Sequence, residues 1–134
     1  MDDEEVYILM CEKATKIQED HDLDLFDIVK VPEYLTPIIV GINHLSHYIN
    51  GCNGLLINID KCVWLPTLEQ LQKMVGINKL DSKWIAWLRF LVDLSWVIND
   101  YPMTFNSMKQ LGLAFVMWEK YKEKWNGEDW IKEE

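Results

Sequence analysis

Two histidines and two cysteines in the middle of the sequence are the residues best suited to hold a metal ion. His44 and His47 lie three positions apart, and Cys52 and Cys62 follow them. On a helix the two histidines would be surface neighbours. Two imidazoles and two thiolates can complete a tetrahedral zinc site. The tight Cys-x-x-Cys pair of strong zinc motifs is missing, so a polar helix face beside two buried cysteines is the competing interpretation.

An acidic run offers a second set of metal-binding atoms. Five carboxylates lie between positions 19 and 27, at Glu19, Asp20, Asp22, Asp24 and Asp27. Oxygens gathered in a short loop suit a divalent cation, but the glycine and the closing glutamate of an EF-hand loop are absent. A solvated acidic loop is the alternative interpretation.

Motifs for catalysis are absent. The sequence has no Gly-x-Ser-x-Gly elbow, no local cysteine-protease signature, no Gly-x-Gly-x-x-Gly run and no Walker loop. With 22 acidic residues in the chain, no particular carboxylate pair is informative. We therefore predict that the protein is not an enzyme and that it needs no cofactor, the zinc hypothesis apart.

Negative charge is concentrated at the start of the chain. The net charge is −9, and residues 1–33 alone hold 11 acids and 3 lysines, a net of −8. Such a surface disfavours direct binding to nucleic-acid phosphates and favours a basic protein partner, although plain solubility would also explain it. The residues predicted to form an interaction surface are Asp2, Asp3, Glu4, Glu5, Glu19, Asp20, Asp22, Asp24 and Trp130.

The order of apolar and capping residues predicts mostly helices. Apolar side chains recur at helical spacing, and two capping boxes, Thr67 with Gln70 and Ser107 with Gln110, mark helix starts. Residues 21–33 are expected to hold one helical turn or a short strand, and residues 55–64 a short β-hairpin or an extended segment. Trp130 and Ile131 are expected to fold back onto Trp125. The predicted helices cover residues 3–20, 37–50, 66–76, 81–99 and 107–126.

These elements predict one mainly α domain over residues 1–134, a compact bundle of about five helices with short connections. Three cysteines do not suggest a secreted disulfide framework. The acidic start is unlike a signal peptide, and the most apolar stretch, residues 84–98, is too short to span a bilayer. We therefore expect a protein of the cytoplasm that does not enter a membrane.

Two segments resemble small uncharacterised acidic proteins of bacteriophages and prophages. The first is Trp64-Leu-Pro-Thr-Leu-Glu-Gln-Leu-Gln-Lys-Met74, and the second is the Trp-rich stretch from Leu111 to Trp130. The resemblance implies a phage or prophage origin and a bacterial host, and it transfers no functional residue.

The function expected from these observations is binding of a host or phage protein, with inhibition of a host nuclease or defence system as its specific form. Two alternatives stay open: a homo-oligomeric structural or accessory protein, and a zinc-supported domain or small metalloenzyme.

Overall fold

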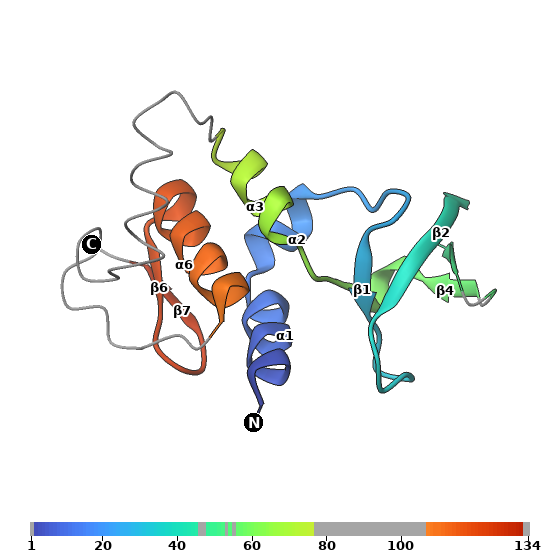
Figure 1. Cartoon of the computed structure of the whole chain (residues 1–134), viewed down its shortest axis with the longest axis horizontal. Coiled ribbons are helices and arrows are strands. Elements are labelled where there is room, and N and C mark those ends of the chain that lie inside the picture. Colours follow the sequence, from blue (N-terminus) through green and yellow to red (C-terminus); the bar gives the residue numbers. More distant parts are fainter. Residues whose placement is uncertain (1, 46–47, 53, 55, 77–106, 133–134) are drawn as a thin grey trace. The chain divides into compact units, whose positions relative to one another are not determined.

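The chain folds into two compact units, which are not the predicted five-helix bundle. The computed structural model describes residues 2–45, 48–52, 54, 56–76 and 107–132 (Figure 1). Unit 1 consists of Met1–Lys13 with Thr67–Glu134, and unit 2 of Ala14–Pro66. Unit 2 contains a five-stranded antiparallel sheet, so the mainly α and all-α predictions are wrong and the chain is mixed α/β. The prediction of a single domain over 1–134 stays a prediction.

Unit 1 is built from three described helices and a β-hairpin. Helix α1 (Asp3–Lys13) begins where Asp2 and Glu5 cap each other's backbone N–H groups. Helix α3 (Leu68–Met74) begins at the predicted capping box, in which Thr67 and Gln70 exchange two hydrogen bonds. Helix α6 (Met108–Tyr121) begins at Ser107, whose hydroxyl accepts from the Gln110 N–H. Local capping therefore set the starts of α3 and α6 as the sequence predicted, whereas the Asp2–Glu5 cap of α1 was not foreseen.

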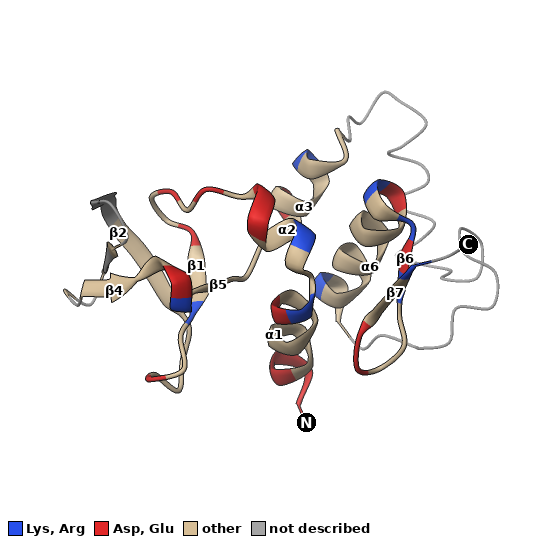
Figure 2. Ribbon diagram, turned by 180° about the vertical axis from the view of Figure 1, so that it is seen from behind, with Lys and Arg blue, Asp and Glu red and all other residues tan. Residues whose placement is uncertain are grey.

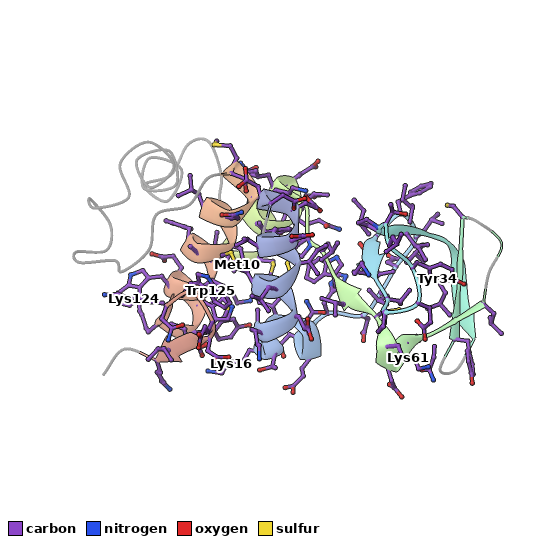
Figure 3. All side chains as sticks on the ribbon, turned by 90° about the horizontal axis from the view of Figure 1, so that it is seen from below. Met10, Lys16, Tyr34, Lys61, Lys124 and Trp125 are labelled. Carbon is purple, nitrogen blue, oxygen red and sulfur yellow. The ribbon has the colours of Figure 1, made fainter. Side chains whose placement is uncertain are left out.

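Helix α6 ends earlier than predicted. Lys122 takes a left-handed backbone conformation (φ 55°) and closes the helix on the carbonyls of Met117 and Trp118. The chain then turns into β6 (Glu123–Trp125), which pairs with β7 (Trp130–Lys132). The expected return of Trp130 onto Trp125 is confirmed, with the two ring centroids 5.2 Å apart. Figure 3 labels Trp125 and Met10, and both side chains are buried in unit 1.

Unit 2 is a short helix followed by a meandering sheet. Helix α2 (Thr15–Asp20) leads into β1 (Ile28–Lys30), β2 (Ile38–Leu45), β3 (Tyr48–Gly51), β4 (Leu56–Asn58), the 3-10 helix η1 (Ile59–Lys61) and β5 (Val63–Trp64). The strand order is β4-β3-β2-β1-β5, with every neighbouring pair antiparallel. The buried core of the sheet consists of Val29, Val31, Ile38, Val40 and Ile57.

The predicted helix over residues 37–50 is instead strands β2 and β3. Its apolar residues at 38, 42, 45 and 49 fit a helical period, but Ile38, Ile39 and Val40 are consecutive β-branched residues that favour an extended chain. Ile28 pairs with Ile39 and Val40 with Gly51, so partners distant in sequence decided the outcome. The strand or extended structure expected within 21–33 and 55–64 is present.

Two further predicted helices differ from the structure or lie outside its described residues. The helix expected over 3–20 is interrupted at Ala14, which separates α1 from α2. The helix expected over 81–99 lies outside the described residues. Among the helices that the structure describes, none combines the length and the apolar character that crossing a bilayer requires.

Candidate functional site

The loop between α2 and β1 presents an aromatic side chain to solvent. Phe26 is 71% exposed, and its neighbour Leu25 is also exposed. Phe26 has a positive φ of 70°, a conformation that is costly for a bulky residue and persists only where surrounding bonds impose it. Two backbone bonds impose it here: the Phe26 N–H donates to the Val40 carbonyl at 2.8 Å, and the Asp27 N–H donates to the Asp24 carbonyl at 3.1 Å.

A buried carboxylate braces this turn from inside. Asp27 is only 4% exposed, and its Oδ2 accepts from the Asp24 N–H at 2.8 Å. The same oxygen lies 2.7 Å from Nε2 of His21. Because an ionised carboxylate only accepts, Nε2 is the donor of this bond. The turn is therefore fixed by a hydrogen-bonded pair that bridges its base.

The hydrogen-bonded pair of Asp27 and His21, which we call the Asp27–His21 brace, is anchored to strand β5. The imidazole of His21 stacks on the indole of Trp64, with 3.5 Å between ring centroids and 9° between the planes. From α2, the Gln18 side-chain amide accepts from the Trp64 N–H (2.7 Å) and donates to the Trp64 carbonyl (2.8 Å). These contacts tie α2 and the start of the loop to one residue of the sheet.

Exposed carboxylates precede the apolar tip in the sequence. Glu19, Asp20, Asp22 and Asp24 are all exposed. Figure 2 shows red segments of Asp and Glu on α2 and on the loop that follows it. We call residues Glu19–Asp27, which are the end of α2 and the loop after it, the acidic-aromatic loop. Four of the residues predicted from sequence to take part in an interaction lie in it, whereas the protruding Leu25 and Phe26 were not foreseen.

A cavity of about 140 Å³ lies beside the brace, and His21, Cys62 and Trp64 contribute to its lining. Asp27 orients His21 as a carboxylate orients a general base. Burial, however, raises the pKa of the Cys62 thiol to about 11, so this thiol stays protonated at neutral pH. A protonated thiol is a poor nucleophile, and the geometry therefore does not favour cysteine-based catalysis.

One buried donor in this region lacks a partner. Nε1 of Trp64 has no hydrogen-bond acceptor among the described residues. The indole instead takes part in the His21 stack through its face. An unpaired buried N–H opposes folding by about 1–3 kcal/mol, so the packing around Trp64 must outweigh that cost.

The proposed zinc ligands are not assembled as the sequence predicted. His44 lies in strand β2 rather than on a helix, and His47 lies outside the described residues. Cys52 is an exposed free thiol after β3, and Cys62 is a half-buried free thiol before β5. Within the described ranges, no three His, Cys, Asp or Glu side chains come together to hold a metal ion. The zinc hypothesis stays a prediction that rests on the sequence.

The other predicted interaction residues serve the structure of unit 1. Asp2 and Glu5 cap α1, and Glu4 forms an ion pair with Lys109 at 3.4 Å. Asp3 is exposed, and its carbonyl accepts from the Gln110 side chain. Trp130 is half-buried and donates from Nε1 to the Met10 carbonyl at 3.0 Å. These contacts give the acids at the start of the chain and Trp130 structural roles.

Comparison with protein-family models, curated proteins and solved structures found no match to this chain.

Proposed function

We propose that the protein acts by binding a basic protein partner through the acidic-aromatic loop. The observation that carries the proposal is Phe26, a mostly exposed aromatic side chain held in a costly backbone conformation by two backbone hydrogen bonds and the Asp27–His21 pair. Strain of this kind collects at binding sites because the geometry that recognises a partner is maintained before the partner arrives.

The apolar and the acidic side chains of the acidic-aromatic loop contribute to binding in different ways. Phe26 and Leu25 provide apolar area, and burying one large apolar side chain stabilises a complex by about 1.5–3 kcal/mol. The exposed carboxylates of the same segment raise the rate of encounter with a positively charged surface and disfavour acidic partners. The matching surface is a pocket for an aromatic ring within a basic rim.

The surfaces that nucleases use for nucleic acid are basic, because they neutralise phosphates. A phage or prophage protein that covers such a surface would inhibit a host nuclease or defence system. We accordingly propose the cytoplasm of a bacterial host as the place of action.

Replacing Phe26 by glycine separates binding from folding. Glycine adopts positive φ without strain, so Phe26→Gly is expected to be at least as stable as the parent while losing the anchor. Wild-type and Phe26→Gly chains would be immobilised and exposed to bacterial lysate, and proteins held by the wild type alone would be identified and purified. We expect Phe26→Gly to weaken binding of the purified partner by about tenfold or more.

A charge variant and a control complete the test. Glu19→Gln combined with Asp22→Asn should slow association and remove most of its salt dependence. Met108→Ala removes an exposed apolar side chain from unit 1 and should leave binding unchanged. A partner that is acidic, or one that binds Phe26→Gly and wild type equally, would refute the proposal.

A further inference from the structure

The cavity beside the Asp27–His21 brace has the features of a binding site for a side chain. Its volume is about 140 Å³. Residues of α2 and of the acidic-aromatic loop line it together with residues of the segment 59–64, which holds η1 and β5. We call it the histidine cavity. All of its lining residues belong to unit 2.

Two hydrogen-bond acceptors of the lining are unused. Because Nε2 of His21 donates to Asp27, Nδ1 of the neutral imidazole carries a lone pair that accepts. Among the described residues, this nitrogen has no hydrogen-bond donor facing it. The carboxylate of Asp22, which is exposed, likewise has no hydrogen bond or ion pair there. A ligand with donor groups would therefore satisfy both.

The other polar groups of the lining are engaged within the chain. The Gln18 side-chain amide accepts from the Trp64 N–H and donates to the Trp64 carbonyl. The Cys62 thiol donates to the Asn58 carbonyl at 3.5 Å. What remains for a ligand is mostly apolar wall, together with the two unused acceptors.

The charge at the histidine cavity is negative. Asp22 is the one carboxylate in its lining, which contains no lysine or arginine. Buried Asp27 lies 2.7 Å from the other edge of the imidazole. The nearest lysine in sequence to the segment 59–64 wall is Lys61, and its charge is offset by Glu33 at 3.2 Å. These local groups favour a cation in the cavity and disfavour an anion.

The size and walls of the cavity suit a lysine side chain. A protein cavity of about 150 Å³ holds one benzene molecule, so this one holds a group of similar size. Lysine is a flexible four-carbon stem that ends in an ammonium group with three donors. Arginine instead stacks its planar guanidinium on aromatic faces. Trp64 offers no open face for this, because it is 3% exposed and stacks on His21.

We infer that the histidine cavity receives a lysine side chain of the basic partner, an inference that rests on the proposed function. The ammonium group donates to the Asp22 carboxylate and to Nδ1 of His21, and the stem packs against Leu23 and Ile59. Phe26 and the histidine cavity are then two anchor points of one loop, joined through the Asp27–His21 brace.

The test uses Nα-acetyl-lysine methylamide as the probe, titrated into the full chain. The norleucine and arginine analogues serve as controls, because norleucine keeps the four-carbon stem without the ammonium group. The ¹H–¹⁵N resonance of the Trp64 indole, assigned with Trp64→Phe, reports binding. We expect saturation by the lysine probe with a Kd of about 1–10 mM and at least about fivefold weaker binding of both controls. No saturation by the lysine probe, or a control that binds equally or more tightly, would overturn the inference.

A pair of matched variants locates the ammonium group. Asp22→Asn removes the carboxylate charge from an exposed side chain and should weaken binding of the lysine probe by about tenfold. Glu19→Gln makes the same change at an exposed acid that does not line the cavity, and it should alter the affinity by less than about twofold. Equal effects of the two substitutions would assign binding to the general acidic field and overturn the inference.

Protection of a thiol gives an independent readout. Cys62 lines the cavity, whereas Cys52 is exposed and lies outside the lining. The saturating lysine probe should slow alkylation of Cys62 by iodoacetamide by at least about fivefold and leave the rate at Cys52 unchanged. An unchanged rate at Cys62 would place the probe elsewhere and overturn the inference.

The Phe26→Gly chain separates this inference from the proposed function. Phe26 does not line the cavity, so the variant should bind the lysine probe like wild type. Failure of the probe to bind, together with a partner that depends on Phe26, would refute the lysine site alone. Binding of the probe, together with a partner that holds Phe26→Gly and wild type equally, would refute the aromatic anchor and leave the lysine site supported.

Discussion

The imidazole of His21 lies flat on the indole of Trp64, 3.5 Å from centroid to centroid. This stack joins the loop after α2 to strand β5, and Asp27 holds the imidazole edge at 2.7 Å. One histidine therefore connects a buried carboxylate, an aromatic ring of the sheet and the turn that presents Phe26.

The first prediction concerns this histidine. His21→Ala removes both the bond to buried Asp27 and the stack on Trp64, and it should lower the free energy of unfolding by about 1.5–3 kcal/mol. His21→Phe keeps an aromatic face and should recover about 0.5–1.5 kcal/mol of that loss. Urea unfolding followed by circular dichroism measures both values. Stability of His21→Ala within error of wild type would show that the brace does not support the fold.

Gly41→Ala tests the strand assignment of residues 38–45. A Cβ at Gly41 would lie 3.1 Å from the backbone Cα and N of Cys52, and 3.2 Å from its Sγ. Because backbone atoms cannot easily move aside, we expect Gly41→Ala to lower the free energy of unfolding by about 1–3 kcal/mol. In the helix that the sequence predicted, the same change would stabilise by about 1 kcal/mol. The sign of the change in urea unfolding therefore decides between strand and helix.

Thr67→Ala should shorten or fray the start of α3. The Thr67 hydroxyl accepts from the Gln70 N–H at 3.2 Å. Its removal should lower the free energy of unfolding by about 1 kcal/mol. Thr67→Ser retains the oxygen and should remain close to wild type. Thermal unfolding of the three proteins provides the comparison, and equal midpoints for alanine and wild type would contradict a stabilising cap.

The three cysteines should differ in how fast they react with a thiol reagent. Cys52 is exposed, Cys62 is half-buried, and Cys11 is buried, with a thiol whose pKa burial raises well above its ordinary value. At pH 8 we expect Cys52 to react with iodoacetamide at least about tenfold faster than Cys62, with Cys11 protected until unfolding. Mass spectrometry of peptides measures each rate, and comparable rates at Cys52 and Cys62 would contradict this order.

The raised pKa of the Cys62 thiol also predicts how the free energy of unfolding changes with pH. Burial in the folded chain disfavours the Cys62 thiolate. Below the ordinary pKa of 9.0 the thiol is protonated in both states, so it does not change the free energy of unfolding. Between about pH 9 and 11 the unfolded chain ionises first, and the free energy of unfolding should fall. Cys62→Ser should show a smaller decrease over this range, and an identical decrease would assign the effect to other groups.

The sequence alone determined those parts of the fold whose cause is local. The starts of α3 and α6 were predictable because Thr67 and Ser107 bond to backbone three residues away. The return of Trp130 onto Trp125 followed from the Asn-Gly turn between them. The acidic character of residues 19–24 was likewise readable from composition.

Tertiary structure decided everything that depends on partners distant in sequence. The apolar spacing at 38, 42, 45 and 49 fits a helix, and only pairing with β1 and β3 made the segment extended. The exposure of Phe26 and the His21–Trp64 stack have the same origin, because both depend on β2 and β5 lying beside β1. Local sequence sets caps and turns through short-range hydrogen bonds, whereas strand pairing gains its free energy from contacts that no short window of sequence contains.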